Sequence, residues 1–163
     1  MALWIGLTGM DSVNIKGQAF PISDRTTQIE KISVSPEIES TDLVINFIDQ
    51  YLNAIHCPAK DIWGILTSVD ELFTNIARHS NDSSYVIVYC WKNIEDNAVF
   101  IRFVDGGIPF NPLLAEEPQM SKKASDRKIG GLGIYISKNL MDSIAYEYLN
   151  NMNILTISKV INK

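Results

Sequence analysis

The segment from Ala59 to His79 constrains the fold most, because its apolar side chains recur at helical spacing on one side only. With 100° of rotation per residue, these side chains point within roughly 60° of one direction. They are Ile62, Ile65, Leu66, Val69, Leu72, Phe73 and Ile76. The pattern predicts a long helix that packs against a core along this stripe.

Strand-like patterns lie on both sides of this helix. The segment TQIEKISVS (27–35) alternates apolar and polar residues, which is typical of a half-buried strand. Further along, YVIVYCWK (85–92) and AVFIRFVD (98–105) are rich in β-branched and aromatic residues, and NIEDN forms a turn between them. Two more strands are predicted at 145–149 and 153–161, joined at NNMN.

Two further helices complete the expected elements. One begins at about Thr41, with Ser40 or Thr41 as its N-terminal cap, and ends near Pro58. The other follows a glycine-rich stretch and covers 133–146, with the sequence GIYISKNLMDSIAY. The chain therefore alternates helical and strand-like segments throughout the part that shows regular patterns.

Composition limits the size of the fold and the kind of partner. A chain of 163 residues with 46% hydrophobic content can bury one core and is small for two. We assign residues 26–163 to a single domain and residues 1–25, which show little periodicity, to an N-terminal arm of unknown role. The formal net charge of -5 argues against nucleic acid or anionic lipid, which require clustered basic residues, and favours a protein or small-molecule partner.

Cysteine usage and hydropathy indicate where the chain works. Cys57 and Cys90 are far apart and form no CxxC pair, so buried thiols are expected rather than a disulfide or a zinc site. No apolar run approaches the ~18 residues of a membrane span. The segment MALWIGLTGM lacks the basic residues that begin a secretion signal. We expect a cytoplasmic protein with no membrane segment.

A polar line also runs along the helix predicted at 59–79. Glu71, Asn75 and His79 are spaced four apart and therefore share one side of the helix. A solvated helix face produces the same spacing, and a histidine in the last turn can simply cap carbonyl groups. These three residues are therefore a candidate site only if a second sequence feature also indicates a ligand.

The end of the strand at 98–105 supplies such a signal in the sequence DGGIPFNP. Asp105 stands where the strand pattern stops, and the glycines after it leave the backbone unobstructed. Pro109 and Pro112 then prevent regular structure. A carboxylate in this position can present an acceptor to a ligand. The same residues also form ordinary turns.

Three glycines, Gly130, Gly131 and Gly133, stand directly ahead of the last predicted helix. Each costs roughly 0.5–1 kcal/mol relative to alanine inside a regular element, so the bare backbone is expected to have a use. The free N–H groups and the dipole of a helix N-terminus attract anions such as phosphate where side chains are absent. The pattern is neither a dinucleotide fingerprint nor a P-loop.

The residues before these glycines, about 111–129, have no regular period, which predicts a mobile lid over the site. Its basic side chains are Lys122, Lys123, Arg127 and Lys128. They are candidates to lie near an anion held by the glycines. Solvated charges on a loop would give the same composition.

Together the motifs resemble a known family. ELFTNIARH, DGGIPFNP and GGLGIYISKNLMD, followed by NILTISK, are similar to the N, G1 and G2 boxes and the terminal strand of the GHKL-type, histidine-kinase-like ATPases. Among these, they most resemble the bacterial anti-sigma factor serine/threonine-protein kinases. The similarity covers about Thr27 to Lys159, and each box matches in residue type, order and spacing.

The resemblance implies roles for the matching residues. Glu71 would be the catalytic general base, and Asn75 would coordinate Mg²⁺ between the phosphates. Asp105 would accept a hydrogen bond from the adenine amino group, with Gly107 allowing the base to approach. Thr156 would hold adenine beside the aspartate.

The phosphates of ATP would lie at the glycines. Gly131 and Gly133, with the backbone amide of Leu132, would line this part of the site. Arg127 is a further candidate phosphate contact that the resemblance does not itself supply. ATP and Mg²⁺ are the implied cofactors. One amide oxygen from the protein suffices for Mg²⁺ if the nucleotide supplies other ligands.

We therefore expect an α/β (α+β) two-layer sandwich, in which three helices cover one face of a mixed, mostly antiparallel sheet. By resemblance, the chain is an ATP-dependent protein serine/threonine kinase that phosphorylates an anti-sigma factor antagonist, binds a sigma factor in a partner switch and forms a homodimer. Its length favours a stand-alone kinase over relatives that need further domains.

A second reading remains open, in which the chain is a partner-binding module and the nucleotide only orders the lid. Glu71 favours the kinase, because a pure binding module has no use for a base that faces the γ-phosphate. A sandwich that binds no nucleotide would require all three boxes to be coincidental.

Overall fold

The computed structural model describes residues 28–79, 83–114 and 132–161. In chain order the elements are β1 (Glu30–Val34), η1 (Ile38–Ser40), α1 (Thr41–Ala54), α2 (Ala59–His79), β2 (Val86–Asn93), β3 (Ala98–Asp105), η2 (Pro112–Leu114), α3 (Leu132–Leu140), β4 (Ser143–Leu149) and β5 (Met152–Val160). The predicted N-terminal arm and most of the predicted lid lie outside the described residues.

The five strands form one sheet in the order β1-β2-β3-β5-β4. All four pairings among the described strands are antiparallel, so the expectation of a mixed sheet is corrected to an antiparallel one. β4 and β5 are joined at Asn150 and Asn151, whose φ angles of 52° and 61° suit the tight hairpin turns that fit twisted strands. Asparagine accepts this left-handed backbone better than most residues do.

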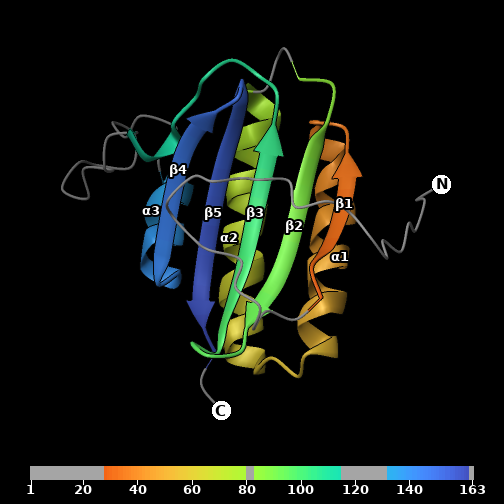
Figure 1. Ribbon diagram of the computed structural model, residues 1–163, viewed down its shortest axis with the longest axis vertical. Helices are drawn as coiled ribbons and strands as arrows, with labels where there is room; N and C mark the ends of the chain where they lie inside the picture. The colour runs from red at the N-terminus through yellow and green to blue at the C-terminus, as the bar shows by residue number, and fades with distance from the viewer. Residues whose placement is uncertain (1–27, 80–82, 115–131, 162–163) are drawn as a thin grey trace, which may run out of the picture.

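The three α-helices all lie on one face of the sheet (Figure 1), which confirms the two-layer architecture. Alternate strand residues such as Ile101, Phe103 and Leu155 point toward the helices. They pack there against the predicted stripe of α2, of which Val69, Leu72 and Phe73 are 0% exposed. Burial of apolar area on both layers therefore holds α2 in the centre of the fold.

The helix bounds test the local patterns. α2 begins at Ala59 and ends at His79, as predicted. Ser40 is the N-cap residue of α1, but its hydroxyl contacts the hydroxyl of Ser35 and makes no capping hydrogen bond. Among the described residues, no helix is both long and apolar enough to cross a bilayer.

The last helix, α3, ends at Leu140, so the prediction of a helix to residue 146 is wrong. Residues from Ser143 onward form β4 instead and pair with β5. The reason is tertiary, since the edge of β5 offers hydrogen-bond partners for a whole strand. An amphipathic local pattern does not contain that information.

Both cysteines are free and buried, as expected. Burial raises the pKa of Cys57 to about 11 and also raises the pKa of Cys90. Alkylation needs the thiolate, so at pH 8 we expect the folded protein to react with iodoacetamide at least ~10-fold more slowly than the urea-unfolded chain. Mass spectrometry of timed samples measures this ratio. Equal rates would contradict the buried placement of both thiols.

Candidate nucleotide site

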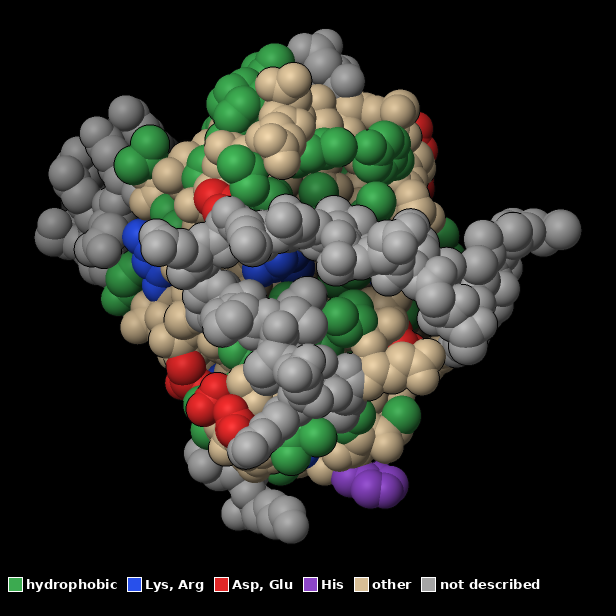
Figure 2. Space-filling view, viewed as in Figure 1, with side chains coloured by type: hydrophobic (Ala, Val, Ile, Leu, Met, Phe, Trp, Pro, Cys, Tyr) green, Lys and Arg blue, Asp and Glu red, His purple; other side chains and the backbone are tan. Residues whose placement is uncertain are grey.

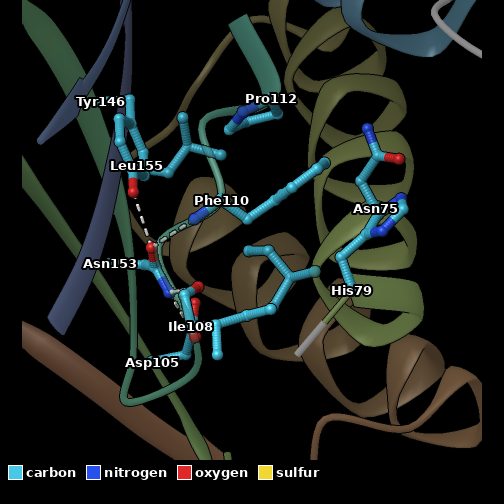
Figure 3. Close-up of a pocket in the computed structure, with 10 residues that line it drawn as sticks. Asn75, His79, Asp105, Ile108, Phe110, Pro112, Tyr146, Asn153 and Leu155 are labelled. Carbon is cyan, nitrogen blue, oxygen red and sulfur yellow. Dashed lines mark hydrogen bonds between the residues drawn. The ribbon is translucent and has the colours of Figure 1, made fainter. Parts of the chain in front are cut away.

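A small pocket lies between α2 and the end of the sheet where β3 stops (Figure 3). Four parts of the chain surround it: the last turns of α2, the end of β3 with the segment that follows it, and the strands β4 and β5. The lining residues are Asn75, Ile76, His79, Asp105, Ile108, Phe110, Pro112, Tyr146, Asn153 and Leu155. Residues of the predicted N and G1 boxes therefore meet in one place.

Asp105 is the carboxylate of this pocket, and its residue is only 4% exposed. Its Oδ1 accepts hydrogen bonds from the backbone N–H of Gly107 at 2.9 Å and from Asn153 Nδ2 at 3.0 Å. Among the described residues, no hydrogen bond occupies its second oxygen, Oδ2. This oxygen lies at the pocket and can accept a hydrogen bond from a ligand that brings a donor.

Glu71 lies one helical turn before Asn75 on α2 and touches the start of α3. A Cβ atom built on Gly133 would be 2.0 Å from Glu71 Oε2 and 2.7 Å from its Cδ. The carboxylate thus occupies the space that any side chain at position 133 would need. The absence of a side chain at Gly133 brings the predicted base to the N-terminus where phosphates are expected.

Asn75 projects from α2 toward the pocket (Figure 3). No described residue makes a hydrogen bond with its side-chain amide, so its oxygen is available as a ligand. Mg²⁺ prefers oxygen ligands and shares them with nucleotide phosphates and water. The residue present therefore fits the role of a single protein ligand to Mg²⁺.

His79 and Phe110 close the pocket on its outer side. Their rings stack with centroids 4.2 Å apart and an angle of 19° between planes. The cavity that remains has a volume of about 20 Å³, enough for about one water molecule and too small for a purine. A purine would fit only after side chains that line the pocket rearrange. The contact gives His79 a partner that sequence spacing did not predict.

Hydrophobic side chains gather at this end of the molecule on the face that Figure 2 shows. In the loop after β3, Ile108, Phe110 and Leu114 are 55%, 36% and 80% exposed. Exposed apolar side chains beside a pocket are typical of surfaces that a ligand or a further segment covers.

The structure does not bring Thr156 beside Asp105, so that expectation is wrong. Thr156 pairs with Arg102 across β5 and β3, and its Oγ1 accepts a hydrogen bond from Arg102 Nε at 2.9 Å. Both side chains point away from the helices, since Ile101 and Phe103 on either side of Arg102 belong to the helix-facing core. Successive side chains of a strand alternate between faces, and position 156 has the wrong parity.

Asn153 occupies the place that Thr156 was expected to fill, and sequence reasoning missed it. It pairs with Asp105 in the register of β3 and β5 and is 6% exposed. A signal was present in the sequence, because Asn153 shares its parity with the core residues Leu155 and Ile157. A polar residue on the buried side of a strand indicates a specific partner.

The predicted phosphate site is described only in part. Leu132 and Gly133 form the first turn of α3, where Leu132 is 51% exposed and its backbone lies at the helix N-terminus. Gly131 and Arg127 lie outside the described residues. Leu132 and Gly133 are therefore the part of the glycine-rich segment that the structure describes, and Gly133 lies next to Glu71.

The sequence profile of the histidine kinase-like ATPase domain matches residues 34–159, which include every described element of the site. This match covers most of the chain. The chain belongs to the histidine kinase-like ATPase domain family. The fold of this ATPase domain is the one described above, with its three helices on one side of the sheet.

Two known proteins are similar to this ATPase domain. The serine/threonine-protein kinase BtrW of Bordetella bronchiseptica is 21% identical over 110 residues, which are 63% of this chain and 78% of that protein. The crystal structure of the RsbU and RsbW domains of a Mycobacterium tuberculosis protein matches with a TM-score of 0.62 and 14% identity. That match covers 84% of this chain and only a third, 33%, of the longer one, and it supports the fold.

Proposed function

We propose that this histidine kinase-like ATPase domain is an ATP-dependent protein serine/threonine kinase of the anti-sigma factor type. The observation that carries the proposal is the free Oδ2 of the buried Asp105, which faces one pocket with Asn75 of α2. One turn earlier on α2, Glu71 lies against the N-terminus of α3. The adenine acceptor Asp105, the Mg²⁺ ligand Asn75 and the base Glu71 would thus lie in this order from the adenine end of ATP to its phosphate end.

Each residue would have a distinct task. Asp105 would accept a hydrogen bond from the exocyclic amino group of adenine, and Asn75 would hold Mg²⁺ with its amide oxygen. Bound Mg²⁺ would neutralise charge on the phosphates. Glu71 would orient the attacking hydroxyl and accept its proton, while the N–H groups at the start of α3, beside Leu132 and Gly133, would bind phosphate oxygens.

The substrate would be a hydroxyl group on another protein. We propose an anti-sigma factor antagonist as phosphoacceptor and a sigma factor as the second partner, in a cytoplasmic homodimer. The support is the similarity to a protein named as a serine/threonine kinase and to a structure that contains an RsbW domain. The net charge of -5 agrees with protein partners rather than nucleic acid.

A second candidate function is a nucleotide-binding partner module without kinase activity. The stacked His79–Phe110 pair and the small cavity favour it. Nucleotide binding would require the surface beside the pocket to rearrange, and such a change can control the binding of a partner. The position of Glu71 against Gly133 favours the kinase, since a binding module needs no carboxylate there.

Phosphoryl transfer separates the two candidates. The full chain is incubated with Mg²⁺, γ-labelled ATP and a candidate anti-sigma factor antagonist protein. Label on a serine or threonine of the antagonist supports the kinase. Nucleotide binding by calorimetry without transfer to the antagonist would support the module instead, and absence of both would contradict the whole proposal.

The adenine contact has its own test in Asp105→Ala. Removing the carboxylate leaves the amino group of a bound adenine without its acceptor, so ATP affinity is expected to fall by ~1–3 kcal/mol, or about 5- to 150-fold. Calorimetry measures the affinity, and a thermal melt reports any loss of the contacts to Gly107 and Asn153 separately. An unchanged dissociation constant would remove Asp105 from the site.

A further inference from the structure

Asn153 uses its whole hydrogen-bonding capacity inside the protein. Its Nδ2 donates toward Asp105 Oδ1 at 3.0 Å and toward the carbonyl oxygens of Gly107 and Ile108 at 3.3 and 3.0 Å. Its Oδ1 accepts from the backbone N–H of Phe110 at 3.1 Å and from the hydroxyl of Tyr146 at 2.7 Å. A carboxamide has two N–H donors and two acceptor sites, so it retains no capacity for a ligand.

The partners also determine which way the amide points. Carbonyl oxygens only accept, so Nδ2 must face Gly107 and Ile108. The backbone N–H of Phe110 only donates, so Oδ1 must face it. It follows that the Tyr146 hydroxyl donates its proton to Oδ1. Burial raises the pKa of Tyr146, which agrees with a phenol that keeps this proton.

These contacts tie three strands and a loop together. Asn153 belongs to β5, Tyr146 to β4 and Asp105 to the end of β3, while 107–110 is the loop that follows (Figure 3). Oδ1 of Asp105 is held by Asn153 and Gly107, which leaves Oδ2 as the oxygen that can meet a ligand. The backbone of Phe110, whose ring closes the pocket on His79, is held by the same amide.

We propose that Asn153 and Tyr146 are positioning residues that hold the 107–110 loop and orient Asp105 so that Oδ2 faces the nucleobase. The inference rests on the proposed function for the identity of the ligand. Both residues line the pocket, and their proposed role is to position Asp105 and the loop rather than to bind the nucleotide. Asn153 acts through Asp105 and the loop, and Tyr146 acts through Asn153 by preventing its amide from rotating.

Tyr146→Phe tests the proposal with the smallest change, because it deletes one hydroxyl and keeps the ring. In the nucleotide-free protein, we expect the amides of Gly107 and Phe110 to exchange hydrogen at least ~5-fold faster, since loss of one buried hydrogen bond costs about 1 kcal/mol. NMR detects these amides individually. The matched control is Tyr148→Phe on the same strand, where Tyr148 is 41% exposed and its hydroxyl makes no hydrogen bond with described residues.

The kinase reaction supplies a second measurement. Tyr146→Phe is expected to raise the KM for ATP about 5-fold and to narrow the preference for ATP over GTP, while kcat stays within about twofold because Glu71 is untouched. Asn153→Asp places a carboxylate against two carbonyl groups and Asp105. Asn153→Asp should therefore abolish the preference for ATP over GTP. Circular dichroism shows whether the variant is folded, and the preference is measured on the folded protein.

The outcomes distinguish this inference from the proposed function. Faster exchange in Tyr146→Phe, with no ATP binding by the parent protein, would support the positioning of the loop and overturn the adenine assignment. Unchanged exchange at Gly107 and Phe110 would overturn the positioning role, whatever the nucleotide results. Equal loss of kcat and affinity for ATP and GTP would also overturn it, because a general structural defect has that signature.

Discussion

Glu71→Gln is expected to reduce phosphoryl transfer to the antagonist by about 10²- to 10⁴-fold, the usual contribution of a positioned general base. Glutamine keeps the shape of the side chain beside Gly133 but cannot accept the hydroxyl proton. ATP affinity should change less than about threefold, because the adenine and metal contacts belong to Asp105 and Asn75. Initial rates of transfer from γ-labelled ATP measure the first quantity, and calorimetry measures the second.

Asp70→Asn is the matched control for this substitution. Asp70 precedes Glu71 on α2 but is exposed, and it is not among the nearest neighbours of Gly133. Asp70→Asn removes the same charge from the same helix but leaves Glu71 in place. The rate of transfer should therefore remain within about twofold of the rate of the parent protein. If Asp70→Asn and Glu71→Gln reduced transfer equally, the effect would come from helix charge and not from a base.

Gly133→Ala is expected to cost most of the transfer activity while leaving the protein folded. The new Cβ would lie 2.0 Å from Glu71 Oε2, 2.7 Å from Cδ and 3.1 Å from Cβ, so the carboxylate must leave its position. The end of a glutamate is flexible and can rotate away, and alanine is favoured over glycine by roughly 0.5–1 kcal/mol inside a helix. We therefore expect transfer to fall at least ~10-fold, with little change in the free energy of unfolding.

Gly64→Ala provides the matched helical control. A Cβ at position 64 of α2 would meet the side chain of Leu140 at 3.8 Å, an ordinary van der Waals distance. It brings the same gain in helix propensity without reaching Glu71, so activity should persist and stability should hold or rise. Urea unfolding and transfer rates are measured for both variants. Full activity in Gly133→Ala would show that the contact between Glu71 and Gly133 has no part in catalysis.

Much of the architecture could be predicted because local patterns carry it. The apolar stripe of α2 occurs at a spacing that only a helix can bury on one side, and the observed bounds of α2 agree with the predicted ones. The strand segments at 85–92 and 98–105 are rich in residues that suit a pleated sheet, and both became strands. Residue types likewise identified Asp105 and Asn75 as candidates, and both line one pocket.

The errors occur where partners are distant in sequence. Thr156 was chosen for its residue type, but strand parity directs it to the far face and directs Asn153 to Asp105. Residues 143–146 continued a helical pattern and yet form β4, because β5 offers them a partner strand. Neither the hydropathy of a segment nor a short motif indicates which strand will pair with that segment.

By itself, the sequence determined the order and nature of most elements and the family to which the chain belongs, since helical and strand periods and short motifs involve neighbouring residues. Only the tertiary structure decided that Asn153 meets Asp105 across 48 residues of chain, that Phe110 stacks on His79, and that Glu71 occupies the space left by Gly133. These contacts depend on strand register and on the packing of α2 against α3. Register and packing are settled by burying the whole core at once, so no single segment specifies them.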